Sequence, residues 1–594
     1  MSDQQNTVLA IVLSIVIIVA FEFFYFGPQR EALERYTAEQ AAIQQEAAVQ
    51  PGDTPAALSA GDAPGLPGDA PSLSGEAPSL PGGGVKPGAS RAEALAATAR
   101  IEVRSPRLLG SISLEGGRID DITLADYRET TDPESPQIVL LSPQGSENAY
   151  FAEFGWIGDG AAMPDRNSLW RADGDLLTPG QPVTLRWDNG EGLLFTRRIA
   201  LDENYMFTIT QRVQNRGSAA VEMLPYSLIN RTNTPDTLGF YILHEGLLGV
   251  FDGTLTEIDY DDLRDEPEGT ESYQTTGGWI GITDKYWLVA LLPDQSETVN
   301  ARFIYTDAGG TDKYQVDTLR AALTVAPGGA IEITDRVFVG AKEVSLLDAY
   351  AEALGNDDIN FDLAVDFGWF YFITKPIFYA LSYFNDLIGN YGVAILMLTV
   401  LIKLGFFPLA NKSYKAMSKM KKLQPKITEM KEKFGDDKAA MQKEMMALYK
   451  TEKVNPAAGC LPVIVQIPVF FSLYKVLFVT IEMRQAPFFG WIQDLSAPDP
   501  TSIFNLFGLI PWTPPDFLTI GVWALLMGLT MWLQQKLNPQ PPDPTQAKIM
   551  MMLPIVFTFI LARFPAGLVI YWCWNNILSI AQQWIIMRKM GVKI

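Results

Sequence analysis

The sequence predicts a membrane protein of the α+β class, with six transmembrane helices (an anchor plus a five-helix core), an all-β sandwich domain outside the cytoplasm and a cytoplasmic helical hairpin. Long apolar runs occur at residues 8–26 and repeatedly within 387–587. Short alternating runs fill residues 101–350, which hold 19 Lys and Arg against 40 Asp and Glu, a net charge of −21. Residues 411–458 hold 12 Lys against 6 Asp and Glu, a net charge of +6.

Residues 1–28 are predicted to form a signal-anchor helix that is not cleaved, because no basic residue precedes the apolar run and bulky Phe residues end it. Residues 29–100 are rich in Pro, Gly and Ala and contain a seven-residue repeat at 61–81. Such a composition cannot form a packed core, so we expect a flexible tether. A Pro-rich ligand for a partner is the alternative.

Residues 101–350 are predicted to form the β sandwich, because apolar and polar residues alternate in short runs separated by Gly and Pro. The runs lie at residues 108–114, 194–201, 205–213, 279–292, 301–305 and 331–339. Residues 351–386 are predicted to form a connector and an amphipathic helix in the membrane interface, since aromatic residues crowd this segment and Lys375-Pro376 interrupts it.

Residues 387–594 are predicted to form the five-helix core, which includes the Lys-rich hairpin 411–458. The five spans are expected near residues 387–409, 460–481, 517–535, 549–564 and 567–587. Basic loops favour the cytoplasm, so the hairpin is placed inside and the acidic domain outside. Both termini then lie in the cytoplasm, although Arg30 and Arg35 favour the opposite orientation for the anchor.

The hairpin carries methionines at helical spacing, and an Asp after Gly435 can cap its second helix. The methionines proposed to contact partners are Met417, Met420, Met430 and Met445. Such residues usually serve packing, whereas the functional interpretation is that they adapt to varied apolar partners. Lysines on the outer faces would attract acidic lipid headgroups or ribosomal RNA.

Lys403 lies inside a predicted span, where a charge is costly and normally faces the bundle interior or water. Thr399 is four residues earlier on the same helix face, and Gln466 lies at a similar depth in the next span. Asn575 and Asn576 mark the middle of the last span. These polar groups predict a hydrated cavity within the membrane, although Lys403 near a helix end is also placed to extend towards water.

Lys475 is nine residues after Gln466, which is half a turn out of phase on a straight helix. Pro468 lies between them and favours a bend. We therefore expect Lys475 to point away from Gln466 and to extend outward to the membrane surface.

The composition excludes several kinds of catalytic site. A single histidine, His244, rules out a histidine pair or a Ser-His dyad, and its neighbour Glu245 alone is weak support for sugar chemistry. Cys460 and Cys573 lie in apolar segments and form neither a disulfide framework nor a CxxC motif. With no P-loop or GxGxxG motif, no enzyme activity, metal or cofactor is expected.

Several strings in the C-terminal half resemble the YidC membrane protein insertase family, of the Gram-negative type with a large periplasmic domain. They are Met417-Ser-Lys-Met420, Leu423-Gln-Pro-Lys426, Glu444-Met-Met-Ala-Leu-Tyr-Lys450, Lys453-Val-Asn-Pro456, Gly459-Cys-Leu-Pro462, Gln466-Ile-Pro468, Arg484-Gln-Ala-Pro487 and Phe564-Pro-Ala-Gly-Leu568. The β domain matches more loosely, through Gly277-Gly-Trp279 and Lys285-Tyr-Trp287.

The resemblance implies a groove open to the cytoplasm and to lipid but closed towards the periplasm. The arginine usual in the family's second span is Lys403 here, which keeps the charge but not the five-donor fork. The family's groove threonine corresponds to Thr399, and its aromatic pair to Tyr571 and Trp572.

The resemblance also implies an insertase and chaperone of the bacterial inner membrane that moves hydrophilic segments across and releases helices into lipid. Expected partners are nascent membrane proteins, the Sec translocon, the ribosome and the lipid bilayer, with no specific nucleic-acid sequence. Three competing functions are a solute transporter, an intramembrane enzyme and a structural scaffold. The transporter is disfavoured because the spans show no internal repeat.

Overall fold

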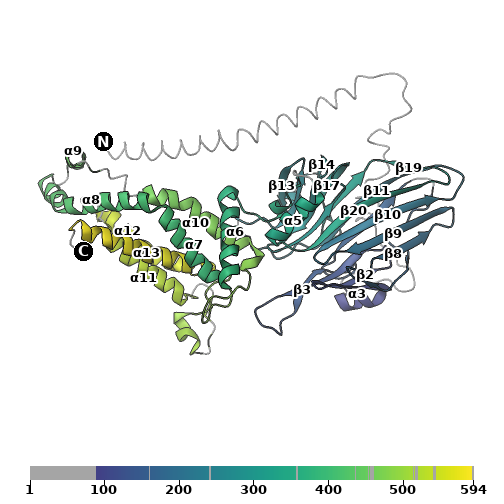
Figure 1. Cartoon of the computed structure of the whole chain (residues 1–594), viewed down its shortest axis with the longest axis horizontal. Coiled ribbons are helices and arrows are strands. Elements are labelled where there is room, and N and C mark those ends of the chain that lie inside the picture. The colour runs from purple at the N-terminus through teal and green to yellow at the C-terminus, as the bar shows by residue number, and fades with distance from the viewer. Residues whose placement is uncertain are drawn as a thin grey trace, which may run out of the picture.

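A computed structural model of the chain describes the residues from Ala89 onward, with short gaps. The described ranges are 89–158, 161–239, 242–355, 359–434, 437–452, 454, 461–510, 512, 514–515, 519–538 and 544–591. The predicted anchor and the tether up to residue 88 lie outside them. The described residues form an elongated molecule with a β sandwich at one end and a bundle of helices at the other (Figure 1).

The β-rich domain predicted from the alternating runs is confirmed, and it consists of two sheets of 11 and 9 strands. The first sheet contains β1 (Arg100–Arg104), β2 (Leu108–Ser113), β3 (Ile119–Arg128), β4 (Gln137–Leu141), β5 (Tyr150–Ile157), β7 (Leu176–Leu177), β11 (Val221–Thr232), β14 (Thr270–Thr276), β17 (Thr298–Asp307), β18 (Asp312–Arg320) and β19 (Leu323–Val325). The second contains β6 (Arg171–Ala172), β8 (Val183–Asp188), β9 (Leu193–Leu201), β10 (Met206–Asn215), β12 (Gly246–Phe251), β13 (Thr254–Asp259), β15 (Trp279–Thr283), β16 (Trp287–Leu292) and β20 (Ala330–Ala341).

The long strands at the centre of each sheet form antiparallel pairs, such as β9 with β10 and β11 with β18. Strand β9 alternates buried and less buried residues along its whole length, as a strand with one face on a core must. The run at 279–292 is not one continuous strand, because the chain turns at residues 284–286 and continues as β16, paired with β15.

The first strand starts at Arg100, next to the predicted start of the β domain at residue 101, but helix α3 (Arg91–Ala97) lies within the segment predicted as a tether. Ser90 and Glu93 form a reciprocal capping box at its N-terminus. Ala94 is buried, and Arg91 forms an ion pair with Asp121 of β3. Residues 90–97 are therefore not part of a flexible tether, as was predicted for 29–100. A second short helix, α4 (Tyr260–Asp265), follows β13.

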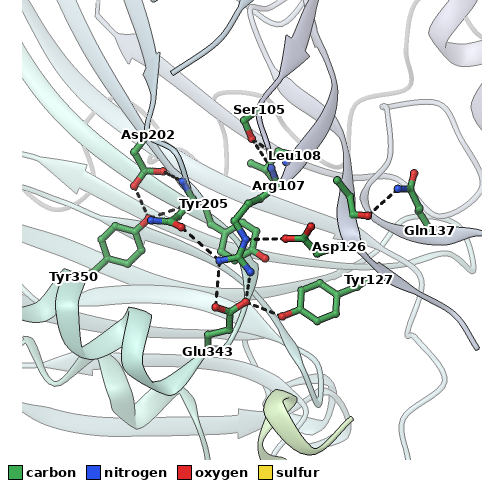
Figure 2. Close-up of polar contacts among 12 residues, drawn as sticks. Ser105, Arg107, Leu108, Asp126, Tyr127, Gln137, Asp202, Tyr205, Glu343 and Tyr350 are labelled. Carbon is green, nitrogen blue, oxygen red and sulfur yellow. Dashed lines mark hydrogen bonds and ion pairs between the residues drawn. The ribbon is translucent and has the colours of Figure 1, made fainter. Parts of the chain in front are cut away.

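Helix α5 (Val344–Leu354) follows β20, and a polar network fastens its first turn to the sheets (Figure 2). Glu343 accepts hydrogen bonds from both terminal nitrogens of Arg107 and one from the Tyr127 hydroxyl at 2.7 Å. Arg107 Nε also donates to Asp126 at 2.9 Å. Because one guanidinium serves two carboxylates, the start of α5 is held in a fixed position.

The helical part follows a 3-10 turn, η3 (Phe361–Ala364). Its helices are α6 (Tyr371–Ile388), α7 (Tyr391–Gly405), α8 (Phe407–Phe434), α9 (Lys438–Thr451), α10 (Leu461–Val479), α11 (Val522–Leu537), α12 (Pro544–Leu561) and α13 (Ala566–Lys589), with 3-10 turns η5 (Ile481–Met483) and η6 (Ile503–Gly508) after α10.

The predicted boundaries of the first core span, 387–409, are wrong at both ends. Helix α6 ends in a left-handed Gly389, and α7 starts after Asn390, whose side chain caps it. A break at Phe406 then separates α7 from α8. The span predicted from residue 517 likewise begins later as α11, with Gly521 at its N-cap.

Helices α8 and α9 occupy the Lys-rich segment. Asp437 accepts a hydrogen bond from the backbone N–H of Ala440 at 3.0 Å and so caps α9, as the sequence predicts. Lys426 of α8 forms an ion pair with Glu452, just after α9, at 2.9 Å. Among the described residues, no single helix reaches the length and apolarity of a bilayer crossing, whereas α7 and α8 together do, with a bend of 69° between them.

Candidate functional site

Helix α13 carries polar residues on two faces in its middle. Asn575 and Ser579 are four residues apart, so they share the face directed at α7. The Ser579 hydroxyl donates to the backbone oxygen of Asn575 at 2.8 Å and accepts a hydrogen bond from Nζ of Lys403 at 2.8 Å. Ser579 therefore holds the lysine against the centre of the last helix.

Lys403 is half-buried and forms no ion pair with any residue that the structure describes. Thr399 lies one turn earlier on α7, and its buried hydroxyl donates to the backbone oxygen of Ile395 at 2.6 Å. The ammonium group consequently has one neutral acceptor and no compensating charge among the described residues. A half-buried positive charge without an ion pair is stabilised when a negatively charged group binds to it.

The face that carries Asn575 also presents Tyr571, one turn earlier. The Tyr571 hydroxyl shares a hydrogen bond with Gln466 of α10. Trp572 packs edge-on against Phe470 with ring centroids 4.8 Å apart. Helices α7, α10 and α13 thus meet around this face, with Lys403 and Gln466 on different neighbours of α13.

Asn576 does not face Lys403. Its side-chain amide donates to the hydroxyl of Thr530 on α11 at 3.2 Å. Further along α13, Gln583 donates to the side chain of Asn538 at 3.0 Å. The two adjacent asparagines therefore face different neighbouring helices, and Asn575 adjoins Lys403 through the hydrogen bond that its backbone oxygen accepts from Ser579.

Ser579 was missed in the sequence, although its position one turn after Asn575 was a usable signal. The four methionines singled out in the hairpin are all half-buried. Met417 packs against a small cluster of Ala410, Tyr414 and Ile586, which joins α8 to α13. For this methionine the packing role is therefore the one observed.

Lys475 points away from Gln466, as expected, but it does not extend outward to the membrane surface. Its Nζ forms an ion pair with Asp366 at 2.8 Å and donates to the backbone oxygen of Ile242, and its side chain is only 14% exposed. A Cβ atom on Gly368, which has a φ of +68°, would lie 2.8 Å from Cε of Lys475. Glycine at this position therefore lets the lysine reach the β domain.

Two further cations fix the junction between the sandwich and α10. Nζ of Lys285, in the turn between β15 and β16, lies 3.8 Å from the ring centre of Phe478. Burial lowers the pKa of Lys285 to about 8. Arg484 donates to the backbone oxygen of Glu129 at 3.3 Å and lies 5.5 Å from the ring of Trp287.

His244 is not a surface residue beside Glu245. Its Nδ1 lies 2.9 Å from Asp259 and its Nε2 lies 3.0 Å from the backbone oxygen of Leu247. Burial opposes the charged form, but the hydrogen bond to Asp259 and the charge of Glu257 outweigh it and raise the pKa of His244. The described residues contain no cluster of His, Cys, Asp and Glu able to hold a metal ion.

Comparison with known proteins matches both parts of the chain. Residues 100–380 match the family model of the YidC periplasmic domain, and residues 383–593 match that of the 60Kd inner membrane protein. The membrane protein insertase YidC of Methylobacterium nodulans is 50% identical over 602 residues, which cover 100% of this chain and 96% of that protein. The YidC of Bradyrhizobium diazoefficiens is 51% identical over 611 residues, covering 100% and 97%.

A crystal structure of an active YidC insertase, with its first transmembrane domain resolved, covers 81% of this chain and 91% of its own, at 18% identity and a TM-score of 0.35. The identity to the curated relatives extends over the whole chain. The β sandwich is accordingly the periplasmic domain of an inner membrane protein, and residues 383–593 are the part that matches the 60Kd inner membrane protein. The chain belongs to the YidC family of membrane protein insertases, which are not enzymes.

Proposed function

We propose that this protein inserts nascent inner-membrane proteins by drawing their hydrophilic, often acidic, segments past Lys403 and releasing their apolar helices into lipid. No covalent step or cofactor takes part. The groups that would line the path are Lys403, Thr399, Gln466, Tyr571, Trp572 and Asn575. Asn576 would act from the α11 side.

The lone ammonium group of Lys403 is the observation that carries this proposal. Its one hydrogen bond within the described part of the chain is to the neutral hydroxyl of Ser579, so an acidic client segment would gain a charge-assisted hydrogen bond there. Moving polar groups into hydrocarbon without partners costs several kcal/mol each, and hydrogen-bonding groups along the path reduce that cost.

The proposal includes six spans, with both termini and the α8–α9 pair in the cytoplasm, because the twelve lysines of residues 411–458 favour that side. In this arrangement the half-buried methionines Met420, Met430 and Met445 contact nascent chains at the cytoplasmic entrance, while Met417 packs between α8 and α13. The ribosome and the Sec translocon would deliver part of the clients, and others would insert through this protein alone.

The test is insertion by purified protein in liposomes of a short client whose translocated segment is acidic. A hydrogen bond to a charged group contributes about 1.5–3 kcal/mol, so Lys403→Ala should slow insertion of this client about tenfold or more. Lys403→Arg should retain most activity because the charge is kept, and Lys403→Glu should be slower than Lys403→Ala because it repels the client.

Lys415→Ala provides a matched control, since this lysine is exposed on α8 and lies outside the proposed path. A client with a neutral translocated segment should be much less sensitive to all Lys403 variants. Equal insertion rates of the acidic client by wild type, Lys403→Ala and Lys403→Glu would refute the electrostatic role.

A further inference from the structure

A cavity of about 960 Å³ lies where the periplasmic domain meets α10. One wall comes from β13 and α4 of the sandwich, and the other from residues 363–371 and from Phe471, Ser472 and Lys475 of α10. The sandwich is periplasmic and α10 belongs to the membrane part, so the cavity lies at the periplasmic surface of the membrane.

The wall of the cavity carries more negative than positive charge. Three of its acids are in ion pairs, Asp259 with His244, Asp261 with Arg264 and Asp366 with Lys475. Glu257 lines the same cavity and forms no ion pair with a described residue. Desolvation raises the pKa of Glu257, although His244 and Lys475 oppose this. The cavity therefore offers a carboxylate that a bound cation would stabilise.

A second observation points to a ligand in the cavity. Ser472 of α10 is fully buried and lines the cavity, and its hydroxyl has no hydrogen-bond partner among the described residues. Buried hydroxyls are normally paired, so an unpaired one facing a cavity indicates a missing acceptor. Trp369 and Tyr371 line the same cavity and present aromatic rings, which attract ammonium groups.

Below the cavity, α10 exposes a continuous apolar stripe. Ile464, Ile467 and Phe471 are 55%, 45% and 41% exposed and lie at helical spacing on the face that also carries Lys475. The stripe therefore runs from the membrane interior up to the cavity. A ligand with a cationic end and attached apolar chains fits both features, whereas a basic peptide fits only the cavity.

We propose that this cavity binds the headgroup of an aminophospholipid. The ammonium group binds Glu257 against the aromatic wall, the Ser472 hydroxyl donates to a phosphate or ester oxygen, and the acyl chains lie along the apolar stripe of α10. The lipid would then fill the junction between the periplasmic domain and the membrane part. This binding is independent of client insertion, so it is measurable without it.

The test is calorimetric titration of the full-length protein, in a non-ionic maltoside detergent, with dihexanoyl-phosphatidylethanolamine and with dihexanoyl-phosphatidylglycerol. The two lipids share their acyl chains and differ in the ammonium group. We expect tighter binding of the phosphatidylethanolamine, and a tenfold loss of its affinity in Glu257→Gln, which corresponds to about 1.4 kcal/mol. Ser472→Ala should weaken binding several-fold without removing the preference.

Asp261→Asn is the matched control, because Asp261 also lines the cavity but is paired with Arg264. It should bind the lipid as wild type does. Equal affinities for the two lipids, or unchanged affinity in Glu257→Gln with an unchanged unfolding midpoint, would overturn the proposal. Tighter binding of a six-residue lysine-rich peptide than of phosphatidylethanolamine would overturn it in favour of a polypeptide site.

Discussion

Glu482 offers a direct test of how the membrane part is fastened to the periplasmic domain. It follows α10, and its Oε1 accepts a hydrogen bond from the backbone N–H of Val344 at 3.1 Å, at the first turn of α5. Its Oε2 is buried without a hydrogen-bond partner among the described residues. Burial raises the pKa of Glu482 from 4.5 to about 7, and the nearby charge of Glu343 adds to the effect.

The sign of the pH dependence follows from this shift. The folded protein favours the neutral form of the Glu482 carboxyl. The contribution of this carboxyl to the free energy of unfolding is therefore fully present below pH 4.5, and it is lost as the pH rises through about 7, where the folded protein must lose the proton. At 1.36 kcal/mol per pH unit, the loss amounts to about 3 kcal/mol. Glu482→Gln keeps the acceptor for Val344 and has no proton to lose, so it should stabilise the protein at pH 8 by up to about 3 kcal/mol.

The assay is chemical unfolding of full-length protein in detergent micelles at pH 4.5 and pH 8, monitored by tryptophan fluorescence. Wild type and Glu482→Gln should have nearly equal stability at the lower pH and should separate at the higher one. Glu352→Gln, an exposed site on α5, is the control and should follow wild type at both. An identical pH dependence in wild type and Glu482→Gln would show that the buried carboxyl carries none of it.

Two further substitutions test the junction and the helical core. Lys475→Met removes the ion pair to Asp366, so cleavage by chymotrypsin after the Phe and Trp residues of 359–370 should become several-fold faster. An unchanged cleavage rate would contradict the anchoring role of Lys475. Trp572→Ala removes the ring contacts with Phe470 and Phe557 and should lower the free energy of unfolding by about 3–5 kcal/mol. Thermal unfolding should show this as a large fall in the midpoint temperature, and a fall of less than about 2 °C would mean that the ring is not packed.

The β domain was predictable because a strand with one buried face must alternate its residues, as β9 does. Helix α3 was hidden because the Pro- and Gly-rich repeat before it dominates the composition, although Ser90 and Glu93 carry the spacing of a capping box. The break between α6 and α7 was missed for a related reason, since apolar residues continue on both sides of Gly389.

The sequence shows which polar residues lie in the apolar segments, but it does not show which residues they contact. The helical period predicts which face of its own helix Lys403 or Asn575 occupies. It does not predict which neighbouring helix packs against that face, and for this reason the contact between Lys403 and Ser579 was missed. The ion pair between Lys475 and Asp366 joins residues on different parts of the chain. No local pattern specifies such a contact, because it depends on how the sandwich docks on α10.

Helix α10 has 19 residues and therefore spans about 28 Å, with Gln466 near one end and Lys475 near the other. One end contacts Tyr571 beside the proposed client path, while the other is fixed to the periplasmic domain. One helix thus connects the two regions, with Pro468 between its ends. A substitution at either end of α10 therefore acts on an element that contacts both the periplasmic domain and Tyr571.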